Sequence, residues 1–309
     1  IAFIGLQGAN LVVNDDSTLL TYVKFVGDFH TIGIGALLAL IGLFIIVVLH
    51  HKNIKGSILI GILATWILGM ICEAIGLYVP DGKDFYSLYP TFRMIDFGAF
   101  GTTFGQCFNV DFSGVDILNF IAVLFAFLFV DIFDTLGTLI GVSTKANMLD
   151  EEGKLPRIRP ALLADAIATS VGAIFGTSTT TTYVESSAGV AAGGRTGLSA
   201  MVTGLLFLLA IVFAPIFTAI PSFATAPALI FVGFLMISSI ISIDFEDITE
   251  AVPAYLAMLA MPLMYSISEG IALGVISYVV INLCCGKAKK IKPLMYILAV
   301  LFVLKYIFL

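Results

Sequence analysis

Long apolar runs alternate with short polar links along almost the whole chain. A helix needs roughly 20 mostly apolar residues to cross a bilayer, so most of these runs are long enough to span a membrane. The pattern therefore predicts an all-α polytopic membrane protein. The run 251–265 is short for a comfortable span. The apolar runs that we predict as helices are 31–49, 56–78, 115–142, 161–175, 199–220, 225–241, 251–265, 267–285 and 293–309.

The charges in the links predict the orientation, because cytoplasmic loops carry an excess of Lys and Arg. The final apolar run can either cross outward or lie in the interface, and the sequence leaves both open. Basic links at 50–55, 143–160 and 286–292 are predicted to face the cytoplasm, and acid-leaning links at 14–29 and 80–114 to face outside.

Composition supports the membrane assignment. Hydrophobic residues make up 60% of the 309 and charged residues 12%, about half the charged fraction of a soluble domain. The 15 basic residues form no long basic stripe, so we predict no nucleic-acid partner. The four cysteines lack metal-type spacing. We therefore predict no metal and no cofactor.

The chain begins at Ile1 without an initiator Met, and its first apolar residues are too few to span. They also lack the basic region of a signal peptide. We interpret this start as the tail of a helix, and we expect the sequence to be the C-terminal part of a longer protein.

One polar interruption, 176–197, lies between two apolar runs. The hydroxyl-rich residues 178–182 disfavour a helix, whereas 183–192 are predicted to form a short helix that a glycine pair ends. Non-helical backbone at membrane depth must be buried in protein or line a polar cavity. A broken helix beside the acid Glu185 is where a transporter would hold its substrate. The alternative is an ordinary Ser/Thr-rich surface loop.

Acids inside apolar helices are the main candidates for chemistry, since each costs about 2.5–3.5 kcal/mol at mid-membrane. Asp131 and Asp134 share one helix face, which Gly137 and Thr138 continue. A structural role is the alternative for Asp131.

Asp134 and Glu185 suggest a shared site, and a buried carboxyl is a plausible proton carrier. Asp165 follows a basic link, so a position at the membrane edge is the alternative for it. We interpret Glu73 and Glu269 as solvated caps near outer helix ends.

Two motifs carry a resemblance to a known family. They are Phe-Val-Asp131-Ile-Phe-Asp134-Thr-Leu-Gly-Thr138 and Thr-Tyr-Val-Glu185-Ser-Ser-Ala-Gly189, the latter followed by Gly-Gly-Arg195-Thr-Gly197. Together they resemble the AzgA-like branch of the nucleobase/ascorbate (xanthine/uracil) transporters, the adenine, guanine and hypoxanthine permeases.

The resemblance covers essentially the whole chain and implies a plasma-membrane permease with fourteen segments in two inverted repeats (7+7), divided into core and gate domains. It implies that the first four segments are absent. The expected parts are 1–114, a truncated gate-domain part of the first repeat; 115–220, the core-domain part of the second repeat with the substrate site; and 221–309, the second gate-domain part with the C-terminal apolar segment.

The resemblance also implies roles for particular residues. Asp134 matches the eighth-segment acid that contacts substrate or the coupled proton, and Glu185 the tenth-segment acid that hydrogen-bonds the base. Asp165 matches a ninth-segment acid, and 178–182 an extended piece whose backbone faces the base. Ser-Ser-Ala after Glu185 departs from the wider family pattern and fits the purine branch. The full candidate set is Asp134, Glu185, Asp131, Asp165, Thr138, Thr182, Tyr183 and Ser186.

A purine suits such a site physically. Its edges carry donors and acceptors, a carboxylate can accept two N–H bonds, and an unwound backbone supplies the rest. Phe129, Phe133 and Tyr183 are candidates to flank the ring. The implied partners are a purine nucleobase, a symported proton and membrane lipid. The preferred purine, proton versus sodium coupling and the oligomeric state, a homodimer included, stay open.

Three other classes compete with a purine permease. An anion exchanger of the same fold should place a basic residue at the broken helix, but Arg195 lies past the end of the short helix. An intramembrane aspartyl protease, the enzyme alternative, would need Tyr-Asp and Gly-x-Gly-Asp motifs, which are missing. A non-catalytic membrane subunit does not account for the buried acids. We therefore predict a transporter and not an enzyme.

Overall fold

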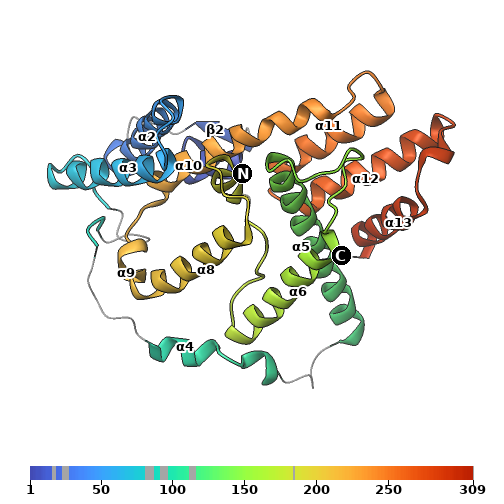
Figure 1. The fold of residues 1–309 in the computed structure, drawn as a ribbon, viewed down its shortest axis with the longest axis horizontal. Coiled ribbons are helices and arrows are strands. Elements are labelled where there is room, and N and C mark those ends of the chain that lie inside the picture. The colour runs from blue at the N-terminus through green and yellow to red at the C-terminus, as the bar shows by residue number, and fades with distance from the viewer. Residues whose placement is uncertain are drawn as a thin grey trace. The chain divides into compact units, whose positions relative to one another are not determined.

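The structure, a computed structural model, describes residues 1–15, 19–22, 28–80, 87–90, 97–110, 116–183 and 185–308. Figure 1 shows that these residues are mostly helical, as the apolar runs predicted. The α-helices are α1 (Ala2–Gly8), α2 (Ile34–His51), α3 (Ser57–Ala74), α4 (Phe97–Thr103), α5 (Ile117–Lys145), α6 (Ile158–Phe175), α7 (Ser186–Ala191), α8 (Gly197–Val212), α9 (Ala214–Phe217), α10 (Ser222–Met236), α11 (Ile248–Leu263), α12 (Ile267–Cys284) and α13 (Pro293–Phe308). The remaining elements are strands β1 (Val12–Asp15) and β2 (Leu19–Tyr22), a π-helical turn at Phe29–Gly33, and 3-10 helices at Gln106–Phe108, Ile237–Ser242 and Ala288–Lys290.

Several of these helices suit a bilayer. Within the described ranges, four helices are long and apolar enough to cross, and four shorter apolar helices accompany them. The four long ones are Phe29–His51, Ser57–Ala74, Ile158–Phe175 and Ile267–Cys284. This supports the predicted polytopic membrane protein.

Two predicted links contain structure that the hydrophobic pattern did not indicate. Part of the link 14–29 forms the hairpin β1–β2, in which Val12 pairs with Tyr22. The all-α prediction did not include this two-stranded hairpin. The link 80–114 contains α4 and the 3-10 turn after it. Both elements are short, so neither produces a long apolar run.

Contacts divide the chain into two compact units. One unit contains Ile1–Phe97 and Glu185–Ile237, and the other contains Gly98–Val184 and Ser238–Leu309. The predicted parts 1–114, 115–220 and 221–309 concern the complete transporter and stay a prediction.

In the first unit, α10 packs against α1, α2 and α3. The helices approach closely: a Cβ on Gly42 of α2 would lie 2.2 Å from the Thr65 hydroxyl of α3. Apolar burial and this close packing hold the helices together. The main core cluster contains Ala9, Ile34, Leu38, Ala39, Trp66, Leu88, Phe223, Ala224 and Ala226.

The carboxylate of Glu73, at the end of α3, is not a solvated cap. It accepts a hydrogen bond of 2.9 Å from the backbone N–H of Leu88, whose carbonyl accepts one of 3.0 Å from the Trp66 indole. Leu88 is fully buried. The prediction for Glu73 was wrong because its hydrogen-bond partner, Leu88, lies in a later link. The local sequence pattern around Glu73 cannot indicate such a contact.

In the second unit, α11 and α12 form a tight helical hairpin, and α12 also contacts α5 and α13. A Cβ on Gly270 would lie 2.2 Å from Met261 Cγ, so the glycine permits the close crossing.

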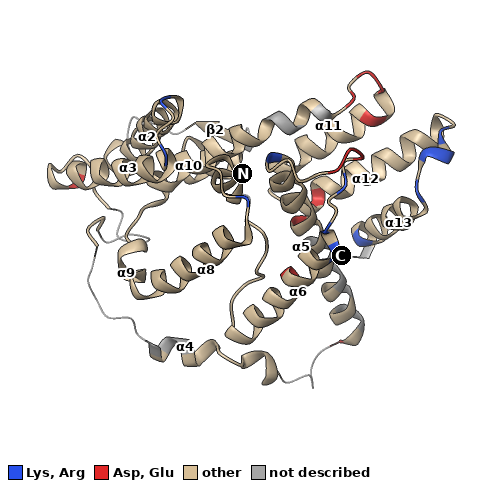
Figure 2. Cartoon of the chain, in the orientation of Figure 1, with Lys and Arg blue, Asp and Glu red and all other residues tan. Residues whose placement is uncertain are grey.

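Acidic and basic residues lie at the open end of this hairpin (Figure 2), and they form ion pairs with one another. Asp247 caps α11 by accepting from the Thr249 N–H, and it pairs with Lys287 at 3.0 Å and Lys290 at 3.2 Å. Lys290 also reaches Glu250 at 2.8 Å. The hydrogen bond from the Thr249 hydroxyl, followed by that from Lys287, holds the pKa of Asp247 well below its usual value, and the bonds to Glu250 and Asp247 raise the pKa of Lys290. The acidic turn and the basic link that follows α12 therefore lie together.

Glu269, in the first turn of α12, is likewise not a solvated cap. Its carboxylate forms an ion pair with Lys305 and accepts a hydrogen bond from the Tyr306 hydroxyl, both near the end of α13. The prediction was wrong because α13 supplies a cation 36 residues later. Since the end of α13 meets the start of α12, α13 runs back along α12, which favours a crossing for the final segment.

Candidate functional site

The face of α5 that carries the predicted acids also carries two buried threonines. Asp131 and Asp134 are half-buried, whereas Thr135 and Thr138 are buried. The Thr138 hydroxyl donates to the carbonyl of Asp134 at 2.9 Å. Thr138 is thus already bonded within its own helix, as mid-helix threonines often are.

Thr135 connects α5 to two other elements. Its hydroxyl donates to Oδ2 of Asp165 on α6 at 2.9 Å and lies 2.9 Å from the hydroxyl of Thr181. Only 1% of Thr135 is exposed, and Asp165 is half-buried. This position argues against a simple membrane-edge role for Asp165.

Sequence reasoning did not single out Thr135 or Thr181. One signal was present, since Thr135 follows Asp131 by four residues and so shares its helix face.

The three carboxylates gather in this region of the second unit. Asp131 interacts electrostatically with Asp165, and Asp134 interacts with both. Apart from these acids, the only charged residues of α5 and α6 are Lys145 and Arg159, near the helix ends. The arrangement offers proton-accepting and hydrogen-bonding groups inside an apolar surround, which is costly unless the groups are used.

Residues 177–183, called the extended piece below, run without helix directly after α6, as the sequence predicted for 178–182. They lie back along α6: the Thr177 N–H donates to the Gly172 carbonyl at 3.0 Å, and the Thr169 hydroxyl donates to the Thr180 carbonyl at 2.8 Å. Some of the backbone groups that leave the helix thus find partners on α6, as buried backbone requires.

Replacing Gly172 by Val should displace the extended piece. A Cβ there would lie 2.9 Å from the hydroxyls of both Thr177 and Thr180, and stiff threonine side chains can move little. We expect faster amide hydrogen exchange over 177–183 and lower solute uptake. Gly101→Val is the matched control, because a Cβ on Gly101 meets open space among the described residues. Unchanged exchange in Gly172→Val would contradict this packing.

The C-terminal end of α6 is anchored by α4 and the turn that follows it. Gly105 N–H donates to the Ile174 carbonyl at 2.8 Å, and the rings of Phe104 and Phe175 meet edge to face. Gly176 has φ +74°, and a Cβ on it would lie 2.7 Å from the Thr103 carbonyl oxygen. This position requires glycine for both reasons, so the start of the extended piece is fixed.

Glu185 immediately precedes α7 in the first unit and is exposed. The predicted helix 183–192 begins only at Ser186, and Glu185 makes no side-chain capping bond to it. Ser186 is exposed, while Ser187 is buried and its hydroxyl has no hydrogen-bond partner among the described residues. A site shared by Glu185 and Asp134 would join the two units and stays a prediction.

The remaining predicted residues have different surroundings. Thr182 is half-buried and Tyr183 is exposed. The centroid of the Phe133 ring lies 5.6 Å from that of the buried Phe302 ring on α13. Phe133 therefore takes part in helix packing. The side chain of Phe129 lies outside those described.

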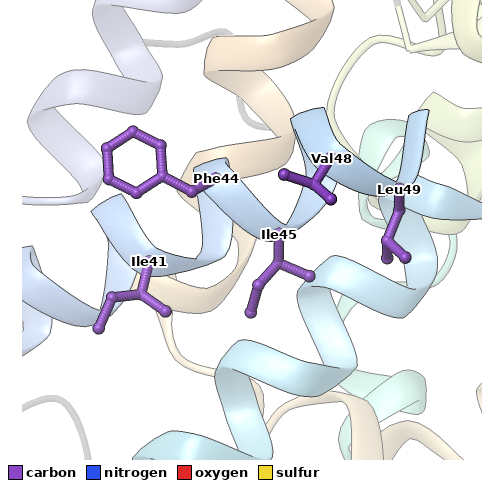
Figure 3. Close-up of a pocket in the computed structure, with 5 residues that line it drawn as sticks. All are labelled: Ile41, Phe44, Ile45, Val48 and Leu49. Atoms are coloured by element: carbon purple, nitrogen blue, oxygen red, sulfur yellow. The ribbon is translucent and has the colours of Figure 1, made fainter. Parts of the chain in front are cut away.

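One hollow on the first unit is unsuited to a polar ligand. It is formed by five apolar side chains of α2 (Figure 3), namely Ile41, Phe44, Ile45, Val48 and Leu49. It offers no side-chain hydrogen-bonding group, so we do not assign it a solute. Among the described residues there is also no group of three His, Cys, Asp or Glu that could hold a metal ion.

Comparison with known proteins gives consistent matches along the chain. The model of the Permease family (Xan_ur_permease) matches residues 1–290. The chain is similar to two guanine/hypoxanthine permeases of Bacillus subtilis, with 43% identity over 309 residues (100% of this chain) and 44% over 308 residues (98%). It is also similar to an adenine permease of Escherichia coli, with 40% identity over 308 residues (100%). The chain spans just under two thirds of their lengths, 66%, 66% and 64%.

Proposed function

This chain belongs to the Permease family, and we propose that the protein is a secondary transporter that imports purine nucleobases together with protons. It is a multi-pass membrane protein, and a permease moves its solute without transforming it. Family membership therefore excludes the protease alternative. The relatives named as guanine/hypoxanthine and adenine permeases support a purine as the solute.

The observation that carries the proposal is the polar cluster on α5, α6 and the extended piece. The Thr135 hydroxyl is hydrogen-bonded to both Asp165 and Thr181, and Asp131 and Asp134 lie near them. Carboxylates and hydroxyls can pair with the donors and acceptors of a planar base. Discontinuous helices with such groups are typical of transporter substrate sites.

The acids support the proposed proton coupling. A carboxyl in an apolar helix can take up a proton and lose its charge, whereas a fixed positive charge cannot. In this proposal Asp134 and Asp165 act in coupling, and Glu185 binds the base from the start of α7. The exposed Thr180 and half-buried Thr182 belong to the piece that faces the solute.

Uptake of radiolabelled purines by the full-length protein tests the function. We expect saturable uptake of adenine, guanine or hypoxanthine, competition by unlabelled purines, and strong inhibition by a protonophore. Uptake that survives the protonophore but disappears without sodium would refute proton coupling. Absence of any purine uptake or competition would refute the purine assignment.

A further inference from the structure

Within the described part of the second unit, the Thr135 hydroxyl connects the carboxylate of Asp165 to the extended piece. It bonds Asp165 on one side and Thr181 on the other, each at 2.9 Å. Resting on the proposed function, we propose that Thr135 is a positioning residue that transmits the protonation state of Asp165 to the hydroxyl of Thr181. The piece that faces the solute would thereby respond to the coupled proton.

The hydrogen-bonded groups of Asp165, Thr135 and Thr181 form a relay, and this relay has two states that differ by one proton. A threonine hydroxyl has one proton to donate and lone pairs to accept. When Asp165 is ionised, Thr135 gives its proton to Oδ2, and its oxygen accepts the proton of Thr181. The Thr181 hydroxyl is then turned inward, so it cannot donate to a solute.

Protonation of Asp165 reverses the chain. The carboxylic acid donates from Oδ2 to Thr135, and Thr135 turns its own proton to the Thr181 oxygen. The proton of Thr181 becomes available for another acceptor, and the ring nitrogens of a purine are acceptors of the required kind. One proton is added to the site, no covalent bond to carbon changes, and binding of proton and solute become mutually favourable.

The charged groups around Asp165 allow this exchange. From α5, Asp131 and Asp134 interact with it as charges. On α6 itself, Arg159 lies almost two turns earlier and is exposed. In the extended piece, Tyr183 is the titratable residue. Three carboxylates therefore lie in this region, and the contact through Thr135 connects one of them, Asp165, to the extended piece.

Three variants of the full-length protein test the relay by purine uptake measured across external pH. Thr135→Val keeps the shape but removes the hydroxyl, and we expect uptake to fall about tenfold or more, with a flattened pH profile. Thr135→Ser keeps the hydroxyl and should retain the wild-type rate and profile. Thr144→Val is the control, because the exposed Thr144 hydroxyl donates to the Ile140 carbonyl of its own helix, and this variant should match wild type.

A wild-type pH profile in Thr135→Val overturns the relay, and so does a Thr135→Ser variant as impaired as Thr135→Val. If Thr135→Val does not reach the membrane, Thr181→Val tests the other end, and a steep pH profile there overturns the proposal. Absence of purine uptake by the wild type refutes the proposed function instead. Hydrogen exchange over 177–183 then decides the relay: protection should change with pH in the wild type but not in Thr135→Val, and identical responses overturn it.

Discussion

Glu185→Gln in the full-length protein should weaken purine binding by ten- to over a hundredfold while leaving the fold intact. Loss of one hydrogen bond to a charged group costs about 1.5–3 kcal/mol, and every 1.4 kcal/mol is about tenfold in affinity. The fold should tolerate the change because Glu185 is exposed and makes no capping bond to α7. Equilibrium binding of labelled purine to the purified protein measures the effect.

Glu246→Gln is the matched control for Glu185→Gln. It removes the same charge from an exposed glutamate in the turn before α11, far along the chain from the proposed binding residues, and should leave the purine affinity unchanged. The role of Glu185 would be refuted by a Glu185→Gln protein that melts normally and binds purine as tightly as the wild type. A lower melting temperature with unchanged affinity would show that Glu185 is structural.

Lys305→Ala should lower the free energy of unfolding by about 2–3 kcal/mol. Breaking a buried ion pair costs roughly 3–5 kcal/mol because the remaining charge is left uncompensated. The side chains of Lys305 and Glu269 are 22% and 23% exposed, so partial solvation reduces this cost. Loss of α13 docking on α12 should also expose Ile291 and Ala299, which belong to the core between these helices.

Neutralising both Glu269 and Lys305 separates the contribution of the ion pair to stability from the contribution of helix packing. In Glu269→Gln with Lys305→Met no charge is left unpaired, so we expect most of the lost stability to return. Lys292→Ala, an exposed lysine in the link before α13, should have no effect. Thermal unfolding in detergent compares all four proteins. A double variant no more stable than Lys305→Ala would contradict the charge-pair explanation.

The helices and the break between them could be predicted because they depend on local patterns. Apolar runs gave α2, α3, α6 and α12 within a few residues, and the hydroxyl-rich piece after α6 is indeed not helical. The start of α7 was placed three residues too early, since small residues after Tyr183 are compatible with a helix but do not require one. Local preference cannot decide such an end.

Contacts between distant residues could not be predicted from those patterns. Thr135 meets Thr181 across 46 positions, Glu73 meets Leu88 across 15, and Glu269 meets Lys305 across 36. Each depends on how helices pack, which no periodicity within one helix specifies. For the same reason the role of Thr135 emerged only from the structure, whereas Asp131 and Asp134 were evident from their spacing alone.

The charged end of the α11–α12 hairpin has a consequence for how the chain enters the membrane during synthesis. Asp247 leaves the ribosome 40 residues before Lys287, its partner. With 16 residues, α11 is shorter than a typical spanning helix. We therefore expect the insertion machinery to retain α11 until α12 and the following lysines have emerged, and to release both helices to the bilayer together.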